Sequence, residues 1–199
     1  MRSMRTVAGL LALGFAVASP ADEGAEKKAG GFWWGGFDLG VTSLSRTYAV
    51  TAATSDSTLA LAFRGGYAWH PRLLLGLELG GWTLEAATYN FGFGEDPEGE
   101  GIQTFLAIAQ YYPKEGSPLF LKAGYGNVSY WNSRPLEDGG HGHNAVLGLG
   151  YDYAIGKSWY ATPAVEFAWG TINGATTPPL ITQDQRYEAV TLRLGVTYR

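Results

Sequence analysis

Six charged residues share the polar phase of an otherwise apolar and glycine-rich alternation: Asp38, Arg64, Glu78, Lys122, Glu166 and Arg193. Asp38, Glu78, Lys122 and Glu166 follow one another at separations of 40, 44 and 44 residues. Three acids and three bases balance in charge, so we expect buried ion pairs and bound water. Two roles fit this set. It could gate a narrow ion path, or it could form a packed polar interior without transport. We favour the packed interior, because the barrel predicted below is narrow enough to be filled by side chains.

Nucleophilic catalysis would need a serine, a histidine and an acid within hydrogen-bonding reach. The chain has three histidines: His70 stands beside Pro71 in an expected short turn, and His141 and His143 fall in an expected long loop. A lone H-G-H in such a loop is a weak signal for a nucleophile or for a metal. No G-x-S-x-G, H-E-x-x-H or phosphate-loop pattern is present. We therefore predict a protein that is not an enzyme, with no catalytic residue, metal or cofactor.

Two further features fall in expected loops. Residues 95–100 (EDPEGE) concentrate four acids, which could bind cations but are more typical of a solvated loop tip. Four exposed aromatic residues are expected near the loops: Tyr89, Phe91, Phe93 and Trp131. They would form either a contact surface for a partner or an outer aromatic girdle, and the sequence does not separate these roles.

The elements that would position these residues are marked by aromatic residues next to tight turns or the chain end: Trp69, Tyr111, Tyr153 and Tyr198. Their separations are 42, 42 and 45 residues. A chain that crosses a membrane repeatedly as a β-barrel places an aromatic ring at the interface on each return. The four residues are therefore predicted to form a periplasmic aromatic girdle.

Eight strands are predicted from a two-residue alternation of apolar with small or polar residues: 32–43, 58–69, 73–84, 102–112, 119–130, 144–154, 159–169 and 187–198. Strands of roughly ten residues suit a tilted crossing of the bilayer. Long connections are expected near 44–57, 85–101, 131–143 and 170–186, alternating with short turns. The predicted fold is an all-β, eight-stranded antiparallel up-and-down transmembrane β-barrel. Both termini would lie on the periplasmic side.

The N-terminus has the features of a secretory signal. Arg2 and Arg5 precede an apolar run that ends in small residues, so residues 1–21 are predicted to be a signal peptide cleaved after Ala18 or Ala21. Residues 22–30 would be a short linker and 31–199 the barrel. The absence of cysteine excludes a disulfide framework. A net charge of −4 argues against nucleic acid as a partner.

A soluble eight-stranded barrel, such as a lipocalin-like binder, is the alternative architecture. It would place apolar side chains inside and polar ones outside. Here one strand face is rich in leucine and aromatic residues and the other holds glycine and charge. The second face suits a narrow polar lumen, so the membrane reading is preferred.

Several segments resemble the small outer-membrane β-barrel proteins of the OmpA/OmpX/opacity type. They are F-W-W-G-G-F-D-L-G (32–40), Q-Y-Y-P (110–113), L-F-L-K-A-G-Y-G (119–126), L-G-L-G-Y-D-Y (147–153) and the closing L-R-L-G-V-T-Y-R. The resemblance covers the mature chain. Two departures are the ending Tyr198-Arg199, where many such proteins end in Phe, and the lack of a peptidoglycan-binding domain after the last strand, which makes wall anchoring unexpected.

The resemblance implies location in the Gram-negative outer membrane, insertion by the barrel-assembly machinery, and contact with outer-membrane lipid and lipopolysaccharide. It also implies a monomer that binds an extracellular ligand through its loops. Adhesion or envelope integrity is the expected role. The alternatives are a lipid A-modifying enzyme, as some eight-stranded barrels are, and a narrow pore.

Overall fold

The computed structural model describes residues 31–48, 54–85, 100–132, 139–177 and 181–199. Nine strands are found there: β1 (Phe32–Tyr48), β2 (Thr54–His70), β3 (Leu73–Glu85), β4 (Glu100–Tyr111), β5 (Leu119–Asn132), β6 (His141–Tyr151), β7 (Tyr153–Ala154), β8 (Trp159–Thr177) and β9 (Ile181–Tyr198). The described residues contain no helix long and apolar enough to cross a membrane.

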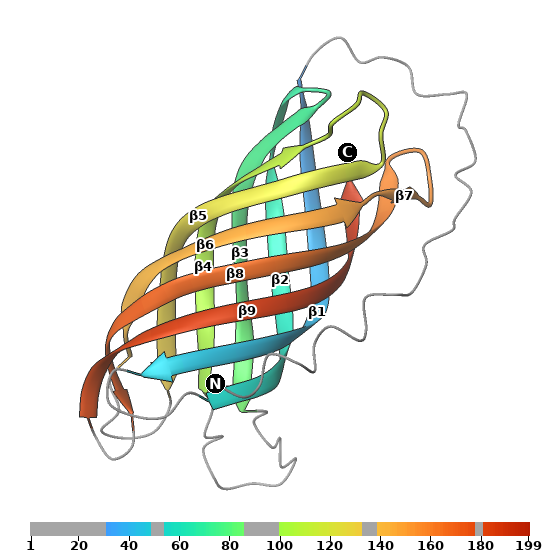
Figure 1. The fold of residues 1–199 in the computed structure, drawn as a ribbon. Coiled ribbons are helices and arrows are strands. Elements are labelled where there is room, and N and C mark those ends of the chain that lie inside the picture. Colours follow the sequence, from blue (N-terminus) through green and yellow to red (C-terminus); the bar gives the residue numbers. More distant parts are fainter. Residues whose placement is uncertain (1–30, 49–53, 86–99, 133–138, 178–180) are drawn as a thin grey trace, which may run out of the picture.

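The strands form one closed antiparallel barrel. Each of β1 to β5 pairs with the next strand along the chain, β8 pairs with β9, and β9 pairs back to β1. β6 and β7 both pair with β8 and are separated only by Asp152, whose backbone N–H donates to the carbonyl of Pro118 (2.8 Å). They therefore form one interrupted strand, and the barrel has the predicted eight strands; Figure 1 shows the closed barrel.

The two ends of the barrel differ. Short connections join the strands at the end that also holds the C-terminus, which we call the turn end (Figure 1). The opposite end, which we call the loop end, leads into residues 49–53, 86–99, 133–138 and 178–180, outside the described structure. At the loop end β8 and β9 pair as far as Thr177 and Ile181, with a bulge at Gly174, whose positive φ of 72° favours glycine.

The hydrogen-bonded pairs give the tilt of the strands. One row of paired residues runs around the whole barrel: Phe37, Phe63, Leu79, Phe105, Asn127, His143, Thr171, Arg186 and Thr47. It returns to β1 ten residues nearer the loop end (47 − 37 = 10). A slide of about 33 Å over about 38 Å of strand spacing tilts the strands by about 40°, so each residue rises about 2.5 Å along the barrel axis.

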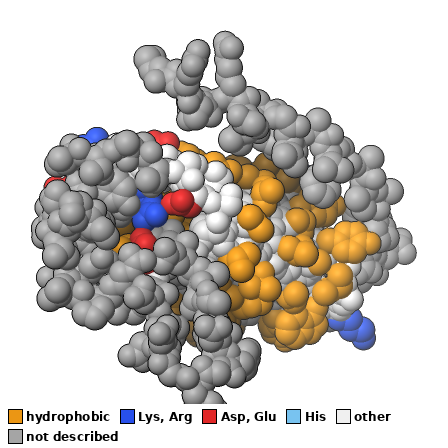
Figure 2. Space-filling view, turned by 90° about the horizontal axis from the view of Figure 1, so that it is seen from below, with side chains coloured by type: hydrophobic (Ala, Val, Ile, Leu, Met, Phe, Trp, Pro, Cys, Tyr) orange, Lys and Arg blue, Asp and Glu red, His pale blue; other side chains and the backbone are white. Residues whose placement is uncertain are grey.

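The outer wall carries an apolar belt. Outward side chains of β2 from Trp69 to Leu59, and of β8 from Trp159 to Trp169, are almost all leucine, aromatic or small apolar residues. Ten residues on such a strand rise about 25 Å, which is the height of the lipid-facing band of transmembrane barrels. Figure 2 shows hydrophobic side chains gathered on this wall. We call this part of the barrel the membrane half.

Beyond the belt the two faces of the wall exchange character. The outward residues are polar, as in Ser43, Ser57 and Asn127, and are exposed. Many inward residues there are large, apolar and buried, and they lie beside buried polar residues such as Thr58 and Gln185; the apolar ones are Leu44, Trp82, Ile102, Val128, Tyr130, Ile172 and Tyr187. We call this part the loop-end half; it has the polarity of a soluble barrel.

Most strands are longer than predicted because of this exchange. β1 continues to Tyr48, β8 to Thr177, and β9 begins at Ile181. Much of the expected long connections at 44–57, 131–143 and 170–186 is therefore strand, and that prediction was wrong. The alternation continues through these residues, but its apolar phase moves to the inner face, so a search for one continuous apolar face ends too early.

Candidate functional site: the lumen and the outer wall

Four buried charged side chains close a ring across the lumen. The Lys122 ammonium contacts Glu78 and lies 2.6 Å from Glu166 Oε1. The Arg193 guanidinium lies 3.1 Å from Glu78 Oε1 and 3.1 Å from Glu166 Oε2. Acid and base alternate around the ring, so each charge has two opposite neighbours and the sum is zero. Gly148 makes room for it, since a Cβ there would lie 3.0 Å from the Glu166 side chain.

The other two predicted charges form a separate pair beside the ring. Arg64 Nη2 lies 3.0 Å from Asp38 Oδ1 and also 3.0 Å from the hydroxyl of Thr197. Thr197 in turn hydrogen-bonds Thr162 (2.9 Å). The structure thus brings all six sequence-predicted charges into the lumen of the membrane half, as a quartet and a pair.

A polar cluster at the turn end extends this network. Thr162 donates to Asp152 Oδ1 (2.9 Å) and the Tyr112 hydroxyl donates to Asp152 Oδ2 (2.7 Å). Burial first, and the Asp152 carboxylate second, raise the pKa of Tyr112, just past the end of β4, well above its usual range. The phenol therefore stays protonated and remains a donor.

The last residue of the chain completes this cluster. Arg199 Nη2 lies 3.2 Å from Asp152 Oδ2, and its guanidinium stacks over the rings of Tyr160 (4.3 Å) and Tyr112 (4.7 Å). Sequence reasoning missed this pair. Asp152 has the same alternation phase as Gly148 and Gly150 and could have been found, whereas a terminal arginine carries no comparable signal.

The four aromatic residues predicted as a girdle point outward at the turn end. Trp69 is 77% exposed, and Tyr111, Tyr153 and Tyr198 are between 40% and 48% exposed. Trp33 and Trp159, which the spacing argument did not include, stand among them and pack edge to face on Tyr67 and Tyr198. Amphipathic rings at one level suit a membrane–water interface.

Charged residues also meet inside the loop-end half. Arg46 on β1 pairs with Asp56 on β2 (2.9 Å) and with Glu100 on β4 (2.7 Å). β3 lies between β2 and β4 in the sheet, so the second pair reaches across it inside the barrel. This cluster was missed because the sequence placed these residues in loops. Tyr89, Phe91, Phe93 and residues 95–99 lie outside the described residues.

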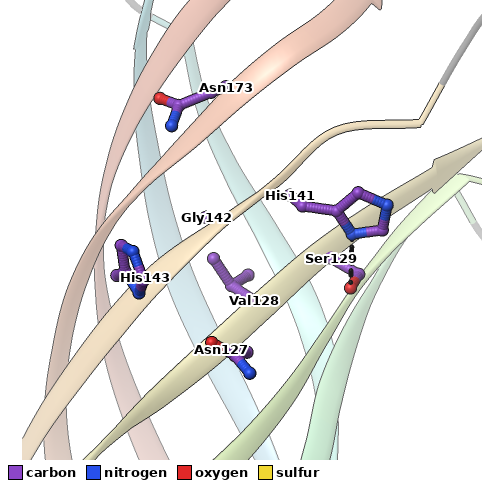
Figure 3. A pocket seen from close by; sticks show the side chains of 7 residues that line it. All are labelled: Asn127, Val128, Ser129, His141, Gly142, His143 and Asn173. Atoms are coloured by element: carbon purple, nitrogen blue, oxygen red, sulfur yellow. Dashed lines mark hydrogen bonds between the residues drawn. The ribbon is translucent and has the colours of Figure 1, made fainter.

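The two loop histidines are on a strand, contrary to the prediction. His141 and His143 belong to β6 and point outward from the loop-end half, and Trp131 likewise lies on β5. His141 Nδ1 lies 3.0 Å from the Ser129 hydroxyl on β5 (Figure 3). Asn127, His143 and Asn173 line the same shallow groove of about 440 Å³.

This serine–histidine contact is the nearest approach to a catalytic site in the part of the chain that the structure describes. Figure 3 shows the imidazole of His141 turned toward Ser129, with Asn173 pointing elsewhere. Among the described residues, no group of three or more His, Asp or Glu side chains is arranged to hold a metal ion.

An apolar outer belt of about 25 Å around a charged, paired lumen requires hydrocarbon outside, because hydrocarbon is the solvent that such a wall matches. Closure of the sheet leaves no edge to satisfy. The fold and the lumen define a transmembrane β-barrel of the outer-membrane type.

Three solved structures resemble this chain. Neisserial surface protein A matches with a TM-score of 0.54 and 13% identity, over 85% of this chain and 98% of that one. AlkL, an outer-membrane protein, matches with a TM-score of 0.48, 16% identity, and 89% and 95% coverage. Ail of Yersinia pestis, an attachment invasion locus protein, matches with a TM-score of 0.44, 10% identity, and 83% and 98% coverage.

No family model matches the sequence, and no curated protein does. The likeness to Neisserial surface protein A concerns the fold, which is that of the small outer-membrane barrels. The Gram-negative outer membrane expected from the sequence agrees with this fold.

Proposed function

We propose that this chain is a non-conducting outer-membrane barrel that carries a rigid interaction platform above the bilayer. Its role would be adhesion or envelope integrity, with an extracellular ligand bound at the loop end. The observation that carries the proposal is the exchange of polarity along the wall. The membrane half fits hydrocarbon, and the loop-end half continues the same strands with a polar exterior and an apolar core.

Such a platform has a physical advantage over loops alone. Strands that project from the bilayer with a packed interior present a fixed outer surface to a ligand, and a site on rigid elements is more precise than one on loops. The chain would enter the membrane through the barrel-assembly machinery and act as a monomer beside outer-leaflet lipid and lipopolysaccharide.

The lumen supports the non-conducting part of the proposal. The ring of four charges and the Asp38–Arg64 pair lie across its middle, and Arg199 lies at the turn end. Large apolar side chains and the Arg46 cluster occupy the loop-end half. An eight-stranded barrel leaves an interior just wide enough for side chains.

Planar-bilayer recording of the purified full-length barrel tests this part directly. We expect no single-channel conductance above the leak of the bilayer, in the wild type and after Glu115→Gln at an exposed turn. Glu78→Ala and Arg64→Ala should also be silent if the interior is packed. Steady conductance in the wild type that Glu78→Ala abolishes would overturn the proposal in favour of the narrow pore.

A lipid-modifying enzyme is the second candidate, because Ser129 and His141 touch on the outer wall near the expected outer leaflet. Mass spectrometry of lipid A from cells with and without the protein tests it. An unchanged acyl pattern supports the platform. A changed pattern that Ser129→Ala restores, but Ser57→Ala on the far wall does not, would establish the enzyme instead.

A further inference from the structure

A hollow of about 390 Å³ opens on the outer wall at the border between the two halves. Tyr125 on β5, Ala145 on β6 and Trp169 on β8 are direct cross-strand neighbours in one row. The small Ala145 side chain between two large rings creates the hollow. Tyr125 is 61% and Trp169 39% exposed, so both rings are accessible from outside.

The upper rim of the hollow is polar. His143 stacks on Tyr125, with ring centroids 6.0 Å apart and planes at 11°. Thr171 and Arg186 continue the rim as successive cross-strand partners of His143. The groove of Asn127, Ser129 and Asn173 adjoins it through His143, which lines both (Figure 3). The site therefore has aromatic walls below and groups that both donate and accept above.

The charges at this rim decide which head group fits. Arg186 is offset by Glu188, the cross-strand partner of Trp169, and by the exposed Asp184 nearby on β9. A phosphate only accepts hydrogen bonds and needs a surplus of cations, which this rim lacks. Sugar hydroxyls donate and accept, and the rim offers amide, hydroxyl, imidazole, guanidinium and carboxylate groups that do the same between them.

The height of the hollow supplies the remaining constraint. His143 and Trp169 stand about 16 Å and 14 Å above Phe37 along the axis, at the upper edge of the belt. A ligand seated there touches hydrocarbon below and water above. Aromatic rings with one apolar and one wet side favour that interface.

We propose that this hollow binds the sugar of an outer-leaflet glycolipid, with the carbohydrate against His143 and the Tyr125 and Trp169 rings and the acyl chains along the belt below. The sugar ring would lie against the exposed side of the stacked Tyr125 and His143 rings. Asn127 and Thr171 would bond its hydroxyls. The inference rests on the proposed outer-membrane location.

Native mass spectrometry of the full-length barrel, released from mixed micelles, measures the occupancy. The probe is a rough-type lipopolysaccharide whose carbohydrate ends at the inner core. The double variant His143→Ala/Trp169→Leu removes the rings of the hollow. The matched control is Ser57→Ala/Leu59→Ala on β2, four strands from β6, three from β8 and within about 3 Å of the same heights. We expect the occupancy to fall about tenfold or more in the first variant and to stay within twofold in the second.

The same lipid after dephosphorylation should still bind, and phosphatidylglycerol should not displace it. Equal loss in both double variants would mean ordinary annular lipid and would overturn the inference. Binding that disappears on dephosphorylation would mean a phosphate site and would overturn it too. Heat-dependent gel mobility reports insertion separately, so a failure of the membrane assignment is distinguishable from a failure of the sugar site.

Discussion

The membrane half and the loop-end half are built from the same eight strands, but the outer face meets hydrocarbon in the first and water in the second. In the membrane half, leucine and aromatic residues face outward, and the ion pairs face inward beside buried apolar side chains such as Leu74 and Phe120. In the loop-end half, serine, asparagine and histidine face outward and Leu44, Trp82 and Ile102 face inward. Strand pairing is indifferent to this exchange, because backbone hydrogen bonds are the same in both halves. The solvent, and not the strand, decides which phase of the alternation is apolar.

The largest loss of unfolding free energy is expected from a mutation in the ring of four charges, which lies in the membrane half. Glu78→Ala leaves Lys122 and Arg193 in a buried ring with one acid between them. Breaking a buried ion pair by removing one partner costs about 3–5 kcal/mol. Urea unfolding of the barrel in lipid vesicles, followed by gel mobility, measures the loss. Glu115→Ala, in an exposed turn, should stay within about 0.5 kcal/mol; a loss no larger than this in Glu78→Ala would contradict a tightly paired lumen.

A matched leucine pair on β1 compares the two halves directly. Leu44 is 0% exposed inside the loop-end half, and Leu39 is 55% exposed on the belt. Leu44→Ala should cost about 2–5 kcal/mol because it leaves a cavity in a packed core. Leu39→Ala should cost less, about 1 kcal/mol, because lipid chains fill the space that the side chain leaves. Both are measured by the same urea titration, and equal losses would mean that the loop-end interior is not packed.

The change of polarity between the two halves also explains how much of the fold can be predicted from the sequence. The two-residue alternation is local information. It predicts the barrel, its eight strands and the placement of Glu78 or Arg193 in the lumen. The strand ends do not, because at Ser43–Leu44 or Ala189–Val190 the apolar phase changes sides. That change depends on where the bilayer ends, which the chain does not state locally. The Asp152–Arg199 pair was missed for another reason: it joins the chain end to a residue far from it in sequence.

The border between the halves can be located by placing a charge on either side of it. Leu77 and Thr83 both point outward from β3, the first on the belt and the second above it. Leu77→Arg should cost about 2–4 kcal/mol, as an arginine does near the bilayer midplane, and Thr83→Arg about 0–1 kcal/mol. Unfolding free energies in vesicles give both values. If Thr83→Arg cost as much as Leu77→Arg, the hydrocarbon would extend over the loop-end half and the proposed platform would be inside the membrane.

Mutations at the turn end test how far the paired lumen extends toward the side of the bilayer opposite the loop-end half. Arg199 is held by Asp152 and by two tyrosine rings at 4.3 and 4.7 Å, and its backbone N–H donates to the Ser158 carbonyl. Arg199→Ala should cost about 1–2 kcal/mol, since a cation–π contact at a partly desolvated site is of that order and Asp152 keeps its Tyr112 and Thr162 donors. Arg199→Lys should recover part of it, because an ammonium keeps the charge but not the planar stack on both rings.

Asp152→Ala should cost more than Arg199→Ala, because it also leaves the buried Tyr112 and Thr162 hydroxyls without their acceptor. If Arg199→Ala and Asp152→Ala were both neutral in the urea titration, the turn end would be held by its aromatic girdle and β-ladder alone, and the paired lumen would end at the Asp38–Arg64 level.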